Sequence, residues 1–288
     1  MTSGSCEPSP PKNDFQALLY TKPVACLFFR VKFVYDQRKI QTTKDKPMKT
    51  LPIALAGAAA IAFIAACSND KFVATEEARE ATMQPTKAEQ TALTPDGILK
   101  DLMAGNEQFA TNQQSSSNVG NRRAKATEGQ YPKAYILSCV DSRVPVEQVF
   151  NQGIGDLFVG RVAGNIETAE QLGSMEFATA LSGVKVVMVL GHEACGAVKG
   201  AADNAKLGNL TTLLEQITPA VDGVEGFEAD RSSKNKEFIG SIIEKNVAMT
   251  VADIRSRSTV LANLEKDGKI MIVGAVYSLT TGKVSLVN

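Results

Sequence analysis

The feature that most constrains the fold is a continuous apolar run at 184–190, in which Lys185 is the single charged residue. An unbroken run of this length is typical of a strand that is buried on both faces of a parallel sheet. Further apolar segments at 134–138, 157–162 and 270–277 also have the length of strands. Helical patterns separate them, so the sequence predicts an α/β fold with a mostly parallel central sheet flanked by helices.

Several helices are expected around these strands. The first begins at Thr94, a capping residue that Pro95 follows at the first helical position. The polar residues 112–121 are expected to form a loop. The remaining helices are predicted at 145–150, 168–181, 197–202, 209–217, 236–255 and 260–265.

An uncharged apolar segment, 51–66, follows the basic residues Lys46 and Lys49. This is the layout of a secretory signal peptide, and the segment is shorter than the roughly 20 residues that a membrane-spanning helix needs. It ends in Ile-Ala-Ala-Cys67, which resembles the lipobox of bacterial lipoproteins, where the cysteine receives the lipid. The resemblance implies lipidation of Cys67 and, because Ser68 rather than aspartate follows it, attachment to the outer membrane.

The signal-like segment does not stand at the start of the sequence, where signal peptides act. We therefore interpret residues 1–47 as an over-extended N-terminus or leader; the alternative is a genuine extension with a membrane-associated segment at 25–35. The remaining divisions are a signal peptide at 48–66, a flexible tether at 67–93 and one folded domain at 94–288. The protein is expected in the periplasm, with a lipid anchor as its only contact with the membrane.

The net charge and the cysteines limit which partners and which kinds of site the sequence can support. The formal net charge is zero and no basic blocks interleave with aromatic residues, which argues against nucleic acid as a partner. The odd number of cysteines makes a poor disulfide framework. They are Cys6, Cys26, Cys67, Cys139 and Cys195. After processing, two free thiols would remain, and in an oxidising compartment they need a bridge or protection, for which metal ligation is one route.

Two short motifs carry the candidate chemistry, and each directly follows a predicted buried strand. The first is Cys139-x-Asp141-x-Arg143, and the second is His192-x-x-Cys195. In open α/β sheets, ligands bind at the carboxyl ends of the strands. Two thiolates and one imidazole suit zinc, and three protein ligands leave a fourth position open, as catalytic zinc sites do.

Asp141 is close enough in sequence to Cys139 to occupy that fourth position itself. Arg143 offers a planar fork that matches a carboxylate. The pair therefore predicts a switch: the site is open to water when Asp141 is held by Arg143, and closed when Asp141 is on the metal.

Other kinds of site fit these motifs less well. A structural zinc site more often uses Cys-x-x-Cys pairs and closes all four positions, and a buried pair of non-ligand cysteines remains an alternative. A metalloprotease motif would need histidine where Gly196 stands. A dinucleotide-binding loop beginning at Gly153 and Gly155 would need glycine where Phe158 stands.

The paired motifs, together with the segment 153–165, resemble the β-class carbonic anhydrases, and the resemblance covers about 94–277. It implies a zinc enzyme, a carbonate dehydratase of the hydro-lyase class with one zinc ion per subunit. The implied reaction is the reversible hydration of carbon dioxide to bicarbonate and a proton by zinc-bound hydroxide. It also implies a homodimer or homotetramer with the cleft at the subunit interface.

The resemblance also assigns roles to single residues. Asp141 and Arg143 match catalytic positions, and Asp141 is implied as a metal ligand in the closed state only. The positions that match substrate-binding residues are Gln130, Phe158, Ala163 and Gly196.

The sequence departs from the family pattern at two positions. Val140 replaces a common serine, and Ile136 replaces the tryptophan of the bicarbonate-inhibited members, although Arg161 matches the arginine of their noncatalytic site. Two rival functions remain: a carbon disulfide or carbonyl sulfide hydrolase of the same family, and a noncatalytic zinc-binding lipoprotein that acts as a scaffold.

Overall fold

The computed structural model describes residues 85–114 and 119–287. The predicted leader at 1–47, the signal peptide at 48–66, Cys67 and the first part of the tether lie outside the described residues. Among the helices of the described residues, none is both long and apolar enough to cross a membrane.

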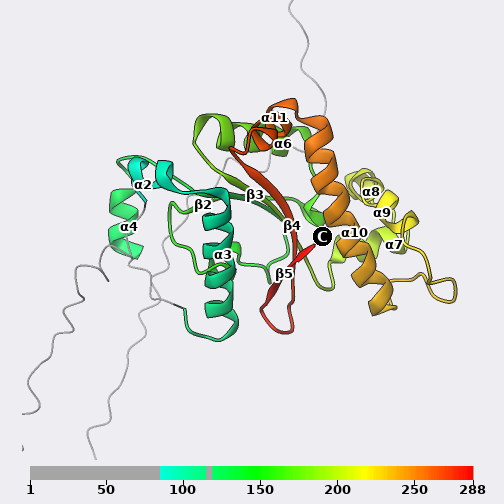
Figure 1. Ribbon diagram of the computed structural model, residues 1–288. Helices are drawn as coiled ribbons and strands as arrows, with labels where there is room; N and C mark the ends of the chain where they lie inside the picture. The colour runs from blue at the N-terminus through cyan, green and yellow to red at the C-terminus, as the bar shows by residue number, and fades with distance from the viewer. Residues whose placement is uncertain (1–84, 115–118, 288) are drawn as a thin grey trace, which may run out of the picture. The chain divides into compact units, whose positions relative to one another are not determined.

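A five-stranded sheet forms the centre of the domain (Figure 1). Its strands, in spatial order, are β2 (Leu157–Arg161), β1 (Ala134–Ser138), β3 (Val186–His192), β4 (Met271–Tyr277) and β5 (Val284–Val287). The first four run parallel, and β5 pairs antiparallel with β4. The predicted α/β fold with a mostly parallel sheet is therefore confirmed.

The continuous apolar run at 184–190 contributes most of the central strand β3, and every residue of β3 is buried. In the parallel register, Ser138 of β1 lies beside Leu190 of β3. The strand β3 then continues to His192, which pairs with Tyr277 of β4. Because β1 and β3 end at the same edge of the sheet, the residues that follow them are brought together there.

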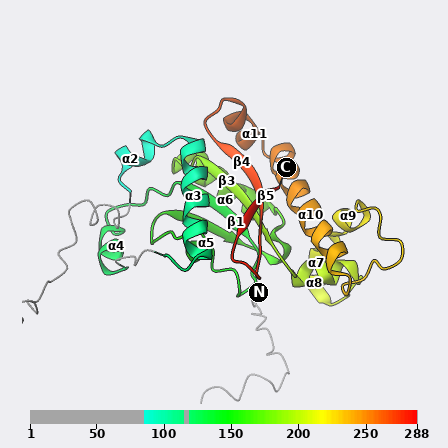
Figure 2. The same ribbon diagram turned by 60° about the horizontal axis from the view of Figure 1, so that its bottom comes forward.

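Helices cover both faces of the sheet (Figure 2). Alternate strand residues point to opposite faces: Ile136 and Met188 contribute to one apolar cluster, and Leu137 and Val189 to the other. The first face is covered by α3 (Pro95–Ala110) and α5 (Val146–Val149). The second face is covered by α6 (Ala169–Glu176), α10 (Lys236–Arg257) and α11 (Thr259–Lys266).

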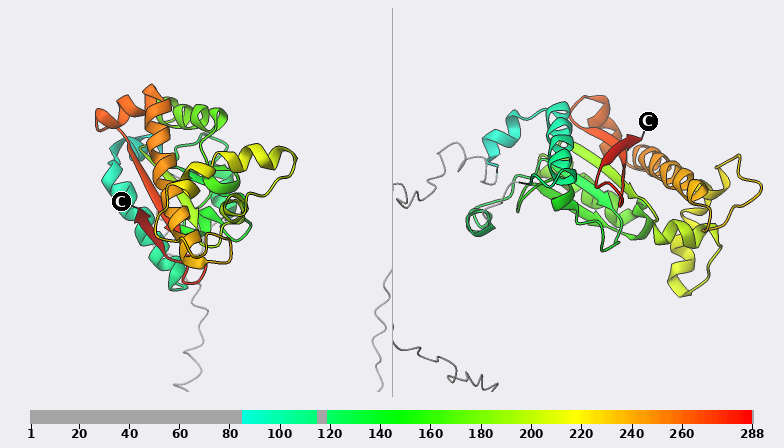
Figure 3. Two further views of the ribbon diagram at one scale, coloured as in Figure 1. Left: turned by 90° about the vertical axis from the view of Figure 1, so that its right-hand side faces the viewer. Right: turned by 90° about the horizontal axis from the view of Figure 1, so that it is seen from below.

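Three shorter helices gather beside α10, at the end of the domain away from α2 (Lys87–Ala92) and α4 (Val119–Lys125) (Figure 3). They are α7 (Gly196–Ala202), α8 (Gly208–Glu215) and α9 (Thr218–Asp222). Their apolar side chains form a third cluster with α10, and this cluster includes Cys139 and Cys195. The packing of this cluster therefore fixes the positions of Cys139 and Cys195.

The capping signals of the sequence are confirmed. Thr94 caps α3 by accepting a hydrogen bond from the Gly97 N–H, with Pro95 at the start of the helix. Thr168 caps α6 by accepting from the Gln171 N–H. The helix predicted at 168–181 is α-helical only to Glu176 and continues as a short π-helix, η2 (Phe177–Leu181).

The predicted tether is wrong at its C-terminal end, because α2 occupies its last residues. A capping box between Thr86 and Glu89 starts this helix. Gln90 is buried and its side-chain amide donates to the carbonyls of Pro132 (2.7 Å) and Ser182 (2.8 Å). The helix lacks an apolar face and is anchored by hydrogen bonds, so hydrophobic periodicity gave no sign of it.

Three other elements were not predicted. Residues 119–121, expected in a loop, begin α4, which is fixed by one buried arginine rather than by an apolar stripe. The helix α9 is a single short turn. The edge strand β5 has only four residues, with one buried position at Val284 and two exposed positions after it, so the sequence carries no periodic signal for a strand.

The arginine that anchors α4 is Arg122, which forms a buried ion pair with Asp156 at 2.9 Å. The same Asp156 oxygen accepts the Gly153 N–H at 2.8 Å. A side chain on Gly153 would meet the Arg122 guanidinium at 2.7 Å, so the glycine makes room for the pair.

We expect Arg122→Ala to lower the free energy of unfolding by about 3–5 kcal/mol, because it leaves the Asp156 carboxylate buried without its partner. The matched control is Arg123→Ala at the exposed neighbouring position, which should change stability by less than about 0.5 kcal/mol. Urea denaturation at one protein concentration measures both. Equal effects of the two substitutions would contradict the structural role of the pair.

Candidate metal centre

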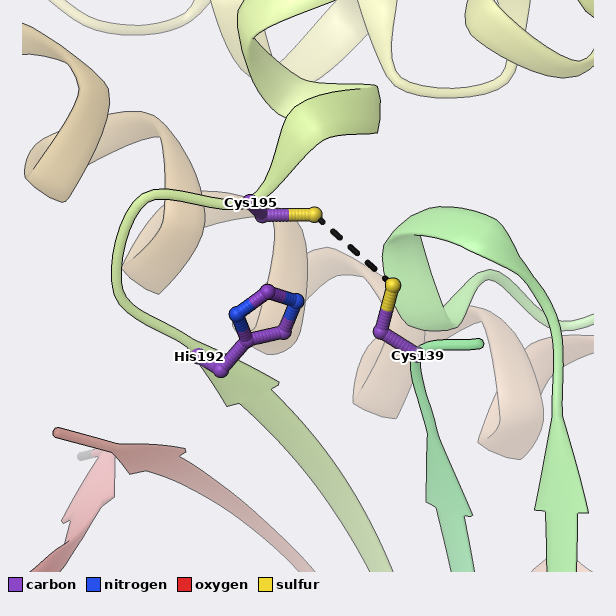
Figure 4. A group of neighbouring side chains, drawn as sticks. All are labelled: Cys139, His192 and Cys195. Carbon is purple, nitrogen blue, oxygen red and sulfur yellow. Dashed lines mark hydrogen bonds between the residues drawn. The ribbon is translucent and has the colours of Figure 1, made fainter. Parts of the chain in front are cut away.

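Three side chains converge at the carboxyl edge of the sheet (Figure 4). Cys139 is the first residue after β1, His192 is the last of β3, and Cys195 is the N-cap of α7. Their ligand atoms all lie within 4.8 Å of one another, and the two Sγ atoms are 4.0 Å apart. All three side chains are buried. The structure therefore brings together the three ligands that the spacing predicted.

The orientation of His192 indicates a ligand role. Its Nδ1 lies 2.9 Å from the backbone oxygen of Glu193, and because a carbonyl can only accept, Nδ1 carries the hydrogen. Nε2 is then an acceptor, and it is buried without a hydrogen-bond partner. An unpaired buried nitrogen is costly, whereas a metal-ligating imidazole has this arrangement, with its second nitrogen bonded to a carbonyl.

The spacing of the sulfurs fits zinc. Zinc–sulfur bonds are about 2.3 Å long, and tetrahedral angles then place two thiolate sulfurs about 3.8 Å apart. The observed Sγ–Sγ distance of 4.0 Å is close to this value. Two sulfurs and one nitrogen are also the donor set that zinc prefers.

The thiol pair favours a bound cation. A hydrogen bond from Cys195 lowers the pKa of Cys139 to about 4, and the same contact, together with burial, raises the pKa of Cys195. The Gly164 N–H also donates to the Cys139 sulfur, at 3.4 Å. The contact between the sulfurs favours one thiolate in the pair, and a bound metal ion would favour loss of the second proton as well.

Asp141 and Arg143 form the predicted pair. The backbone N–H and Nε of Arg143 each donate to Oδ1 of Asp141 at 2.9 Å, and Nη2 donates to Oδ2 at 2.7 Å. These hydrogen bonds hold the pKa of Asp141 well below its usual range. Oδ2 lies 3.9 Å from Nε2 of His192. A carboxylate therefore stands beside the point where the ligand atoms converge, and its two oxygens are both bonded to arginine.

Arg161 has a role that the sequence analysis missed. Its Nε donates to the Cys139 carbonyl at 2.9 Å, and its Nη2 donates to the Asp141 carbonyl at 2.6 Å. The guanidinium thus clamps the backbone of the first motif. The position of Arg161 was predictable, because it ends the strand next to β1 and pairs with Ser138. Its hydrogen bonds to backbone carbonyls were not, because the sequence of side chains does not show which backbone groups will lie near them.

Hydrogen bonds hold the turn between His192 and Cys195 against the end of β4 and the residues that follow it. The Glu193 N–H donates to the Tyr277 carbonyl at 3.0 Å, and its carboxylate accepts from the N–H and hydroxyl of Thr280, both at 3.2 Å. Ala194 adopts φ = 54°, a left-handed conformation that is strained for a residue with a side chain. The turn is therefore held in an unfavourable shape by its neighbours.

Two of the four predicted substrate-binding residues lie beside the ligands. Ala163 precedes Gly164, whose N–H contacts the Cys139 sulfur, and Gly196 follows Cys195 at the start of α7. Both are close to the metal centre within one chain.

The other two do not reach it within one chain. Gln130 is exposed and precedes β1, whereas Cys139 follows the end of that strand, and β1 alone spans about 13 Å. Phe158 pairs with Tyr135 near the start of β1, and its ring packs against Phe177 with centroids 6.1 Å apart.

The fold and the side-chain cluster define an α/β protein with a candidate Cys₂His metal centre at the carboxyl edge of a mostly parallel sheet. Residues 134–284 match the family described as carbonic anhydrase. A carbonic anhydrase of Mycolicibacterium smegmatis is 36% identical over 198 residues, which cover 67% of this chain and 93% of the relative. Carbonic anhydrase 2 of Mycobacterium tuberculosis is also 36% identical, over 67% of this chain and 92% of its own.

Solved structures share the fold. The β-carbonic anhydrase of Coccomyxa, in complex with acetazolamide, matches with a TM-score of 0.53 at 23% identity, over 65% of this chain and 85% of that one. A tetrameric β-carbonic anhydrase of Sordaria macrospora matches with a TM-score of 0.52 at 21% identity, over 66% of this chain and 97% of that one. The chain belongs to the carbonic anhydrase family and has the fold of its β class.

We expect Arg161→Met to weaken metal binding about 10- to 100-fold, because the clamp on the Cys139 carbonyl is lost. Arg161→Lys, which can keep one of the two hydrogen bonds, should have an intermediate effect. Ser142→Ala, in the same segment but exposed, is the control. Competition with a chromogenic chelator measures all three, and wild-type affinity in Arg161→Met would contradict the role of the clamp.

Proposed function

We propose that the protein hydrates carbon dioxide reversibly to bicarbonate and a proton, with one zinc ion per chain held by Cys139, His192 and Cys195. One observation carries the proposal: the unpaired Nε2 of His192 faces two sulfurs whose spacing suits zinc, next to a carboxylate held by arginine. Three protein ligands leave a position for a small reactant, which distinguishes this arrangement from a structural site.

The protein's own groups prepare the reaction. When bound, zinc supplies a nucleophile near neutral pH by lowering the pKa of water from about 16 towards 7. Oδ2 of Asp141 is placed to accept a hydrogen bond from the reacting water and to orient it. Arg143 keeps that carboxylate ionised and turned away from the metal position, so that the position stays open.

The proton that the reaction releases needs another carrier. The single histidine of the chain is a proposed ligand, so no histidine shuttle is available within it. Buffer in the solvent, Asp141 or a surface carboxylate must take the proton instead, and of these Asp141 is the weakest acceptor because Arg143 lowers its pKa.

We also propose that the active unit is at least a homodimer, with a tetramer as the larger alternative. Gln130 and Phe158 lie towards the far end of β1 from the metal ligands of their own chain, so they can serve a site only across an interface. Apolar side chains near Phe158 support such an interface, because Phe177 is 48% exposed and Leu181 is 76% exposed.

For the N-terminal region we propose export. The apolar segment 48–66 acts as a signal peptide, and Cys67 becomes the lipidated first residue of a periplasmic protein attached to the outer membrane. The support is the basic start, the apolar length and the small residues before Cys67.

The central test measures zinc content and carbon dioxide hydration together. The wild type should bind one zinc ion per chain and be active. Cys195→Ala should lose both, because a ligand is removed. Asp141→Ala should keep zinc and lose about 100-fold or more in kcat/KM, because water is no longer oriented.

The control for this test is Ser142→Ala, which should behave as the wild type. Zinc bound without hydration activity would overturn the proposal and favour a scaffold. Activity on carbonyl sulfide or carbon disulfide, without activity on carbon dioxide, would favour the hydrolase alternative.

A mixing experiment tests the interface. Gln130→Ala and Asp141→Ala chains should each be weakly active alone, but a hybrid dimer contains one intact site if Gln130 acts across the interface. Random exchange should then restore about a quarter of the wild-type activity. Activity that stays at the average of the two variants would show that Gln130 does not act in the partner's site.

Intact mass of the protein isolated from membranes tests export. We expect a chain that begins at Cys67 and carries lipid, and a Cys67→Ser variant that is neither lipidated nor held by the membrane. A mature species that retains residues 1–66 would contradict the processing that we propose.

A further inference from the structure

A cavity of about 530 Å³ borders on the turn that connects His192 to Cys195. Glu193 and Ala194 form part of its wall. Its remaining lining comes chiefly from α10, with Lys199 of α7 and residues near the β4–β5 turn. The volume lies within the range of small-molecule binding sites. The metal chemistry does not use this cavity, so its lining calls for a separate explanation.

The polar groups of the cavity are arranged along one face of α10. Lys236, Gly240 and Glu244 are four residues apart, so they share a face that extends for about 12 Å. Ile239 and Ile243 lie next to them and also line the cavity. The cavity thus has a cationic end, an apolar middle and an anionic end.

The charged groups at the two ends are not used elsewhere. Within residues 85–114 and 119–287, no ion pair or side-chain hydrogen bond engages Lys199, Lys236 or Glu244. In contrast, the carboxylate of Glu193 is bonded to Thr280. Two ammonium groups and one carboxylate therefore remain for a ligand, which favours a molecule that carries both charges over a polyanion.

We propose that this cavity binds a linear aminocarboxylate, a small molecule with an acidic and a basic end joined by a short apolar chain. Its carboxylate is placed between Lys199 and Lys236, and its ammonium group faces Glu244. Its methylene chain lies over Gly240 against Ile239 and Ile243. The site is independent of the proposed function, because it rests on residues outside the metal centre.

The position of the cavity couples the ligand to the metal centre. A bound molecule contacts Glu193 and Ala194, whose backbone sets the separation of His192 from Cys195. Ala194 has a left-handed conformation in this turn, so a molecule that displaces it would also change the separation of His192 from Cys195. The ligand therefore acts as a regulator of the hydration rate.

Calorimetry on the zinc-loaded full chain tests the site with two probes, 6-aminohexanoate and hexanoate. We expect 6-aminohexanoate to bind about tenfold more tightly, because of its contact with Glu244. Glu244→Gln should abolish the difference between the probes. Lys236→Met and Lys199→Met should weaken both probes, while Lys245→Met on the exposed surface of α10 should weaken neither.

Gly240 offers a variant that fills the cavity. A Cβ atom added at Gly240 meets nothing within 4 Å, so the position accepts a side chain, and the leucine of Gly240→Leu should occupy the space of the ligand. Gly240→Ala is the matched control, with the same gain in helix propensity and little lost volume. Leucine should abolish the binding of 6-aminohexanoate and its effect on the hydration rate, whereas alanine should abolish neither.

The outcomes separate the parts of the proposal. Equal binding of the two probes to the wild type, or unchanged binding to Gly240→Leu, would overturn the site. Binding that leaves the hydration rate unchanged at saturation would overturn the regulatory coupling. The binding result does not depend on hydration activity, whereas the regulatory result rests on the proposed function and is measured only on chains that the central test shows to be zinc-loaded and active.

Discussion

The parallel pairing of β1 with β3 is the constraint on which the candidate site depends. Cys139 and Cys195 are far apart in sequence, and neither motif contains enough ligands to hold a metal alone. The register that places Ser138 beside Leu190 makes both strands end at one edge, so that the two motifs meet. A slip of this register would separate the sulfurs and also turn the buried faces of β3 away from their partners. Fold and site are therefore specified by the same contacts.

Most polar groups around the candidate metal centre bond to other groups of the protein and so position the ligands. Arg161 clamps two carbonyls, Gly164 donates to a sulfur, and the carbonyl of Glu193 fixes the imidazole. Arg143 is committed to Asp141 through three hydrogen bonds. Such a network keeps the ligand atoms in place before any ion arrives, which reduces the reorganisation that binding requires. It also explains why one carboxylate can stand so close to the metal position without occupying it.

Sequence reasoning was most successful where apolar periodicity and side-chain chemistry carry the information. The buried run of β3, the cap at Thr94 and the three ligands were all predicted from local pattern. It failed where polar contacts between residues far apart in sequence determine the structure. The helix α2 depends on hydrogen bonds from Gln90 to two distant carbonyls, and Arg161 donates to backbone oxygens. The positions of Gln130 and Phe158 relative to the ligands depend on strand direction, which a match by sequence position does not convey.

The closeness of the two sulfurs has a consequence for the life of the protein before it acquires metal. At 4.0 Å, the Sγ atoms of Cys139 and Cys195 need to approach by only about 2 Å to form a disulfide bond. In an oxidising compartment, an empty chain therefore faces a kinetic competition between ion capture and oxidation, and the oxidised product has no thiolate left to offer. If the protein is exported as proposed, maturation would depend on which event comes first, and the supply of metal at the time of folding would set the fraction of active chains.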